Sequence, residues 1–212
     1  MIISKLRRTL PVMAALALLL ALPLRSGAGD DLARAVLAEL NAARANPKAY
    51  AQHLRVYRSQ FSGKYHIPPG TRIRYATREG TAAVDEAIRF LEGRHPLPPL
   101  AWSDGLARVA AELNREQSRT GAVGHASGRM EIRTRAERVG RWQSTIGENI
   151  SYGPDDPRRV AMQLIIDDGV PDRGHRTNIF APDFRVAGIA CGPHPAFETS
   201  CVIDFAGWFT ER

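Results

Sequence analysis

The sequence predicts a single α+β domain in which layers of helices and strands pack together. Apolar residues recur at intervals of three and four in several stretches before residue 167, which is the spacing of amphipathic helices. Two short apolar runs, at 186–191 and 201–206, close the chain and read as a pair of strands. Helices that precede and separate strands favour a layered domain, and the 184 residues of 29–212 suit one core.

Residues 1–28 have the composition of a secretory signal peptide. An apolar run over residues 9–24 is followed by small residues, which fits cleavage after Ala28. The basic residues that precede the run are Lys5, Arg7 and Arg8. Export by the twin-arginine route is an alternative reading of the Arg7-Arg8 pair. We therefore predict that residues 29–212 form the exported domain, which is secreted or periplasmic.

The exported chain is only modestly basic. The full chain carries a formal charge of +7, and removal of Lys5, Arg7, Arg8 and Arg25 with the signal peptide lowers it by four to +3. The remaining arginines are scattered among acidic residues, which argues against nucleic acid as a partner. No second apolar run is long enough to cross a bilayer, so we expect no membrane span after cleavage.

Two helices are predicted before residue 59. Asp30 or Asp31 can cap the first, which should end near Asn46 and has these apolar positions on one face: Leu32, Val36, Leu37 and Leu40. Pro47 disfavours helix before it and suits the first turn of the second helix. Residues 59–77 show no clear period and are predicted to be a long loop or insertion.

A third helix is predicted from Thr81 to Gly93, and a fourth is capped by Ser103. The proline-rich stretch at 95–99 connects them in an extended form. Residues 121–145 have little periodicity and are predicted to be a long surface connection.

Asp156-Pro157 opens one more helix, which Gly169 and Pro171 should end. A further strand is expected over 149–152, although its pattern is weak.

The chain contains two cysteines, Cys191 and Cys201, one in each closing strand. Antiparallel pairing of these strands would bring the two cysteines together across a hairpin. An exported protein meets an oxidising environment, which favours a disulfide bond. The alternative is a pair of buried free thiols.

Three glycine-led blocks carry the side chains best suited to chemistry. They are Gly124-His125, Gly147-Glu148-Asn149-Ile150 and Gly174-His175-Arg176-Thr177-Asn178-Ile179. Two histidines and a carboxylate are the smallest set that holds zinc with an open coordination position. The blocks are spread over about fifty residues, so they form one site only if the fold brings them together.

These blocks resemble the signature of the CAP superfamily, the cysteine-rich secretory, antigen 5 and pathogenesis-related proteins, in its bacterial form. Leu40-Asn41 with Arg44, and the stretch 97–113, are similar to the first helices of that family. The resemblance leaves out about residues 59–94, which we interpret as an atypical insertion. It implies an α-β-α sandwich with a central antiparallel sheet, and a cleft lined by His125, His175 and Glu148.

The family usually supplies a second acidic residue, a glutamate three residues after a tryptophan. This chain has no tryptophan at that place and reads Leu164-Ile165-Ile166-Asp167-Asp168-Gly169 instead. Either Asp167 or Asp168 can serve as the second acidic residue of the cleft, and we favour Asp168. Asn149, Arg176 and Asn178 are expected to support the cleft, with structural hydrogen bonding as the main role of Arg176 and Asn178.

The resemblance implies a secreted domain that binds a small molecule, a lipid or a protein. A neutral pair of His125 and His175 is able to hold Zn²⁺, with Glu148 as a third ligand or as a base on bound water. The alternatives are a metal-assisted hydrolase with Glu148 as the catalytic base, and a lipid carrier. A plainer reading is that the two histidines and Glu148 only cap loops and turns.

Overall fold

The computed structural model of the protein describes residues 27–126 and 130–212. The predicted signal peptide lies outside the described residues except for its last two positions. Within the described part of the chain, no helix combines the length and the apolar character needed to cross a membrane.

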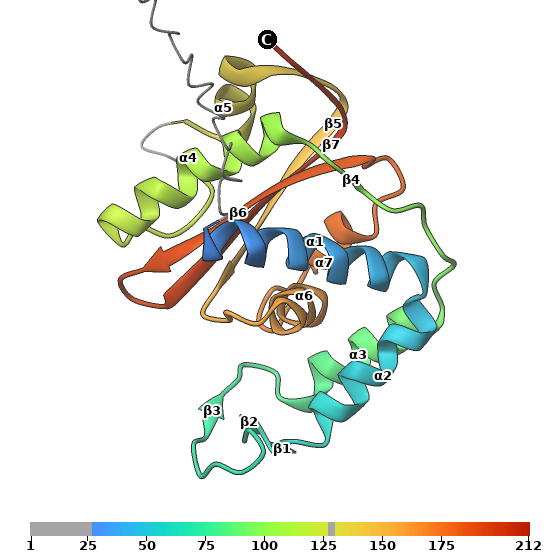
Figure 1. Ribbon diagram of the computed structural model, residues 1–212. Helices are drawn as coiled ribbons and strands as arrows, with labels where there is room; N and C mark the ends of the chain where they lie inside the picture. The colour runs from blue at the N-terminus through green and yellow to red at the C-terminus, as the bar shows by residue number, and fades with distance from the viewer. Residues whose placement is uncertain (1–26, 127–129) are drawn as a thin grey trace, which may run out of the picture.

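The centre of the fold is a four-stranded sheet with the order β4-β6-β7-β5 (Figure 1). Its strands are β4 (Ala101–Trp102), β5 (Gly140–Tyr152), β6 (Val186–His194) and β7 (Glu198–Glu211). The three long strands pair antiparallel, and the short β4 pairs parallel with β6. Because β5 pairs with β7 on one side only, it is an edge strand of this sheet.

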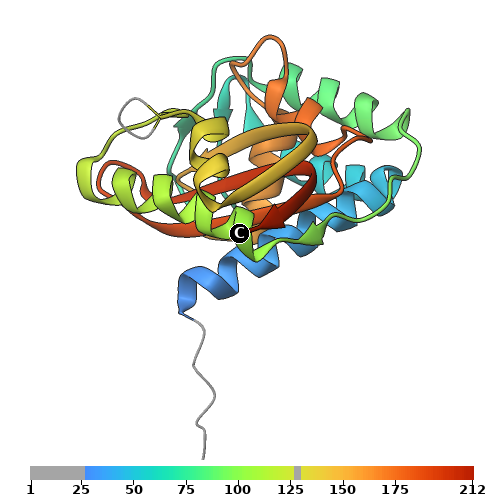
Figure 2. The same cartoon turned by 90° about the horizontal axis from the view of Figure 1, so that it is seen from above.

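Helices cover both faces of this sheet, as the three-layer sandwich requires. On one face lie α4 (Asp104–Thr120) and α5 (Ile132–Val139), which cross the near side of the sheet in Figure 2. On the other lie α1 (Ala28–Ala45), α6 (Pro157–Ile166) and α7 (Gly174–Ile179). The predicted α+β sandwich is therefore confirmed, with β4 as the parallel exception in the sheet.

The first helix begins three to four residues earlier than predicted. Gly27 is its N-cap residue, and Asp30 and Asp31 lie in the first turn, where their charge favours the positive end of the helix dipole. Near its other end, Arg44 is fully buried and donates hydrogen bonds to the carbonyl oxygens of Ile179 at 2.7 Å and Pro98 at 3.0 Å. Arg44 therefore ties α1 to the end of α7.

The segment between α2 (Pro47–Arg58) and α3 (Thr81–Glu92) is more ordered than a loop. It contains three two-residue strands, which pair antiparallel in chain order: β1 (Phe61–Ser62), β2 (Tyr65–His66) and β3 (Tyr75–Ala76). Strands this short leave no period-two pattern, so the sequence showed no sign of them.

The prediction of a surface connection over 121–145 is partly wrong. Its second half forms α5 and the start of β5. The inward positions of α5 are Arg135 and Ala136, and the helix has no apolar stripe that periodicity can detect.

The closing hairpin confirms the predicted disulfide bond. Cys191 and Cys201 are register partners on β6 and β7, with Cα atoms 4.1 Å apart, and their sulfurs are bonded. Both strands extend beyond the predicted runs, and Gly192-Pro193 lies inside β6 rather than in the turn. Gly188 of β6 lies against the backbone of Leu106 and Ala107, so only glycine lets α4 approach the sheet this closely.

Candidate functional site

Histidine 125 lies directly over the glutamate of the second glycine block. Gly124 has a positive φ of 97°, and its N–H donates to the Tyr152 hydroxyl at 2.9 Å, which fixes the loop that follows α4. The Nδ1 atom of His125 is then 2.9 Å from Oε1 of Glu148 on β5. The first two glycine blocks thus meet, with the imidazole exposed and the carboxylate buried.

A buried arginine, which the sequence analysis did not single out, engages the other oxygen of Glu148. Arg135 of α5 is fully buried and donates to Oε2 of Glu148. It also donates to the carbonyl oxygens of His125 at 2.9 Å and Met130 at 3.2 Å. Both carboxylate oxygens of Glu148 are therefore occupied, one by a cation and one by an imidazole.

A second buried carboxyl group, Asp204, faces Glu148 from the neighbouring strand. Asp204 is the register partner of Glu148 and is fully buried. Within the described residues neither of its carboxyl oxygens has a donor. Burial raises the pKa of Asp204 well above its ordinary value, and the nearby charge of Glu148 raises it further. A protonated Asp204 can donate to Glu148, which two ionised carboxylates cannot do.

Asp204 had a signal in the sequence, because a charged residue in the apolar run 201–206 is rare unless it is paired or neutral. Arg135 had none, since its helix carries no recognisable pattern.

The other histidine pairs with Asp167 at the end of α6. Asp167 is the C-cap residue, and its φ of 59° places it in the left-handed region, which aspartate tolerates better than most residues. Its Oδ1 lies 2.6 Å from Nδ1 of His175, and its Oδ2 accepts the backbone N–H of His175 at 3.0 Å. The turn after α6 therefore positions the imidazole.

Asp168, which we favoured as the second acidic partner, is not the aspartate that contacts His175. Its two carboxylate oxygens accept the backbone N–H groups of Arg78 and Glu79, each at 2.8 Å. The left-handed turn at Asp167 directs the two neighbouring side chains to different partners. Asp167 contacts the histidine, and Asp168 fastens the segment that precedes α3.

Of the three predicted supporting residues, Asn149 and Asn178 hold α7 against β5, and Arg176 ties α7 to α6. Asn149 donates from Nδ2 to the carbonyl of His175 at 2.9 Å, and Asn178 donates to Oδ1 of Asn149 at 2.9 Å. Arg176 is buried and donates to the carbonyls of Ile165 at 2.5 Å and Ile166 at 3.0 Å. These contacts are structural, and they join the second and third glycine blocks.

A pocket of about 330 Å³ opens beside His175, between α6, the end of β5 and the segment that leads into α3. Its volume is at the lower end of the range of small-molecule sites. The lining residues are Tyr57, Thr77, Ile150, Tyr152, Pro154, Arg159, Met162, Gln163, Leu164, Ile166, Asp167, Asp168, Val170 and His175.

The sequence model of the cysteine-rich secretory protein family, CAP, matches residues 37–205. The chain belongs to the CAP family. Within this CAP domain the three glycine blocks supply His125, Glu148 and His175, and each histidine has a carboxylate at its Nδ1 atom. No match is found among the curated proteins.

Three solved bacterial structures resemble this CAP domain. An extracellular SCP-domain protein from Bacillus anthracis is 24% identical, with a TM-score of 0.44, over 52% of this chain and 34% of its own. An outer surface protein from Borrelia burgdorferi is 16% identical, with a TM-score of 0.45, over 55% and 80%. A cysteine-rich secretory protein from Staphylococcus aureus is 15% identical, with a TM-score of 0.41, over 66% and 44%. The chain thus spans about a third of the length of the Bacillus anthracis protein.

The arrangement offers few ligands to zinc. With Nδ1 of each imidazole facing a carboxylate, Nε2 is the nitrogen left to bind a metal in His125 and His175. Among the described residues, however, no three histidine, cysteine or acidic side chains are placed to hold a metal together. Protein zinc sites use three or four ligands, so the two imidazoles alone do not complete one.

We therefore expect weak zinc binding at most. Calorimetric titration of zinc into the metal-free domain at neutral pH should give no stoichiometric tight binding, and the His125→Ala, His175→Ala double variant should titrate alike. Tight binding of one equivalent that the double variant loses would contradict this expectation.

Proposed function

We propose that the protein is a secreted or periplasmic binding module that takes a small organic anion with an apolar tail into the pocket beside His175. The proposal depends chiefly on one observation: the guanidinium of Arg159, which lines this pocket, has no hydrogen-bond or ion-pair partner among the described residues.

Arg159 of α6 is the main free donor. Its guanidinium is exposed and, within the described residues, makes no ion pair and no side-chain hydrogen bond. The hydroxyl of Tyr57 likewise has no hydrogen-bond partner among the described residues. A carboxylate or phosphate group could accept hydrogen bonds from both of these side chains.

The acidic groups of the pocket already have partners. Asp167 accepts from His175, and Asp168 accepts two backbone N–H groups. The other polar lining groups are engaged as well: Gln163 contacts Ser151 and the carbonyl of Tyr152, and the Tyr152 hydroxyl contacts Gln117 and Gly124. Among the described lining residues, Arg159 is therefore the charged side chain that has neither a hydrogen-bond nor an ion-pair partner.

The remaining lining is apolar and suits a short hydrocarbon or aromatic tail. It comprises Ile150, Met162, Leu164, Ile166 and Val170. A pocket of this size favours a short ligand over a whole lipid, which speaks against the lipid-carrier alternative.

The hydrolase alternative is weakened by the surroundings of Glu148. A general base has to reach a water molecule, yet both oxygens of Glu148 are engaged and its side chain is only 2% exposed. Glu148 is better placed to orient His125 than to take a proton from water.

Matched amphiphiles test the proposal directly. In calorimetric titrations, octanoate should bind the wild-type domain and octylamine should bind at least about tenfold more weakly, because only the anion pairs with Arg159. Arg159→Gln should weaken octanoate binding about fivefold to tenfold. Val170→Trp should abolish it by filling the pocket.

Arg158→Gln is the matched control, because Arg158 is the neighbouring exposed arginine and pairs with Glu39 rather than lining the pocket. It should leave octanoate binding unchanged. Equal binding of octylamine and octanoate, or an Arg159→Gln variant that binds octanoate like wild type, would contradict the proposed preference for an anion. Binding of neither amphiphile would contradict the proposed ligand site in this pocket.

A further inference from the structure

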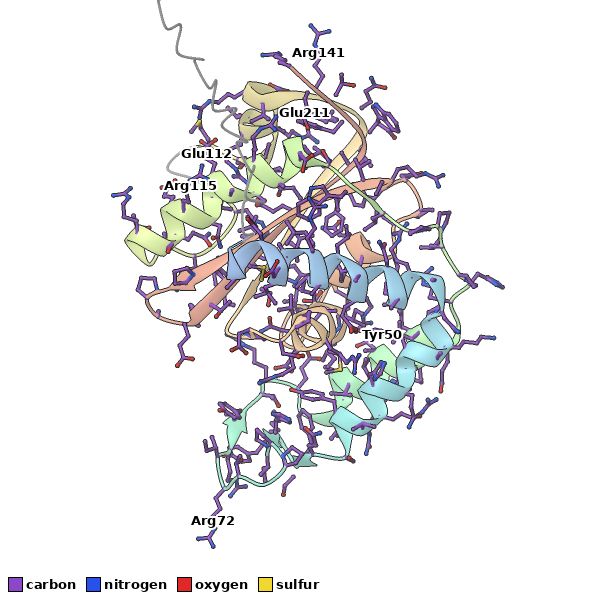
Figure 3. All side chains as sticks on the ribbon, viewed as in Figure 1. Tyr50, Arg72, Glu112, Arg115, Arg141 and Glu211 are labelled. Atoms are coloured by element: carbon purple, nitrogen blue, oxygen red, sulfur yellow. A yellow bond between two sulfur atoms is a disulfide. The ribbon has the colours of Figure 1, made fainter. Side chains whose placement is uncertain are left out.

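The insertion between α2 and α3 carries a concentration of positive charge. Residues 59–78 include four basic side chains and no acidic one: Lys64, Arg72, Arg74 and Arg78. All four are exposed. In Figure 1 the β1–β3 sheet projects away from the sandwich, and Figure 3 shows Arg72 pointing outward at its far end.

None of these four basic side chains forms an ion pair within the described residues. The guanidinium of Arg74 lies 4.3 Å from the centre of the Tyr65 ring, which is a cation–π contact rather than a neutralising one. Two acidic groups at the base of the insertion have other partners, since Asp168 binds backbone amides and Glu79 pairs with Arg173. No direct ion pair within the described residues therefore neutralises the positive charge of the insertion.

Large apolar side chains are exposed among these cations. Tyr65 is 41% exposed, Ile73 55% and Tyr75 50%. They are three of the seven large apolar residues that are exposed in the described chain, and they fall within eleven positions of the sequence. Clustered exposure of this kind marks an interaction site more often than scattered surface residues do.

The insertion presents these residues on a fixed frame. The Thr77 hydroxyl donates to the Lys64 carbonyl at 2.7 Å, and the Ile67 N–H donates to the Gln60 carbonyl at 2.8 Å. Asp168 fastens the end of the insertion to the sandwich. Tyr65 and Arg74 lie on one face of this small sheet and Tyr75 lies on the other face with its register partner His66, so the basic and aromatic groups project from both faces of one ordered protrusion.

We propose that this insertion surface, defined by Lys64, Tyr65, Arg72, Ile73, Arg74, Tyr75 and Arg78, docks on an anionic lipid bilayer. Lysine and arginine are attracted to anionic headgroups, while tyrosine settles at the boundary of headgroups and acyl chains and isoleucine enters the acyl region. A purely ionic partner would account for the cations and leave the three exposed apolar side chains unexplained. The inference is independent of the ligand proposed for the pocket.

Vesicle sedimentation with the exported domain, residues 29–212, tests this docking. The domain should pellet with phosphatidylglycerol vesicles and remain soluble with phosphatidylcholine vesicles, and raised salt should release part of it. The Arg72→Glu, Arg74→Glu variant should lower the partition coefficient at least about tenfold. The Ile73→Ser, Tyr75→Ser variant should also weaken binding and make the remainder more sensitive to salt.

The Arg115→Glu, Arg119→Glu variant is the control, since it makes the same charge change on exposed arginines of α4, away from the insertion (Figure 3). It should bind phosphatidylglycerol nearly as wild type does. Equal losses in both charge variants would show attraction by overall charge and overturn the proposal. Failure of the domain to pellet with phosphatidylglycerol vesicles would overturn the proposal too. Heparin that displaces the domain from the vesicles in a way that depends on the arginines, and not on Ile73 and Tyr75, would also overturn it.

Discussion

Replacing Arg135 by leucine should lower the free energy of unfolding by about 3–5 kcal/mol, which is a large part of the stability of a domain of this size. The change removes the cation that contacts buried Glu148 and leaves that carboxylate beside Asp204. It also removes the donor to the His125 and Met130 carbonyls. Urea unfolding followed by circular dichroism measures the effect.

Two further variants separate the ion pair from general packing. Arg138→Leu changes an exposed arginine of the same helix, paired with Glu112, and should alter stability by less than about 1 kcal/mol. The Arg135→Leu, Glu148→Leu double variant should regain part of the loss, because no buried charge is then left unpaired. A single Arg135→Leu variant as stable as Arg138→Leu would contradict the expected burial of this pair.

Replacing Asp204 by asparagine should make the protein relatively more stable as the pH rises. The pKa of Asp204 is raised in the fold, so the folded protein binds a proton that the unfolded chain releases above its ordinary pKa of 3.8. The wild-type free energy of unfolding therefore falls by up to about 1.4 kcal/mol per unit of rising pH between the unfolded and folded pKa values of Asp204. The Asp204→Asn variant lacks this fall because asparagine does not titrate. Asparagine keeps a neutral donor for Glu148.

The measurement is a series of unfolding free energies from pH 4 to pH 8 for both proteins. The advantage of Asp204→Asn over wild type should grow with pH until the folded pKa is passed, and then stay constant. The exposed Asp183→Asn variant serves as the control and should show no such trend. A difference that shrinks with rising pH would mean that Asp204 is ionised in the fold.

Local signals in the sequence were enough to predict most helices and the disulfide bond. Ser103 and Asp156 cap α4 and α6 as predicted, with side-chain oxygens that accept the N–H groups of Leu106 and Arg159. Capping is a contact over three residues, which makes it visible in sequence. The cysteines could be paired because each lies in a strand with a clear pattern.

The parts that could not be predicted depend on contacts distant in sequence. Arg135 occupies an inward position of α5 because its guanidinium donates hydrogen bonds there to Glu148 and to two carbonyl oxygens. Whether Asp167 or Asp168 meets His175 depends on a single left-handed residue. Nothing in the composition of Asp167-Asp168-Gly169 distinguishes the two carboxylates, so the sequence left both open, and the favoured Asp168 is not the one that contacts His175.

The two neighbouring aspartates after α6 determine what happens if the segment between α2 and α3 is deleted. Deleting residues 59–79 would remove the two amide donors of Asp168, which are Arg78 and Glu79, while the adjacent Asp167 has to keep its turn in order to hold His175. The insertion is therefore part of the support of the histidine, even though it lies outside the sandwich. A shortened chain would lose a membrane-facing surface and disturb the pocket at once, so only point substitutions can separate the two roles.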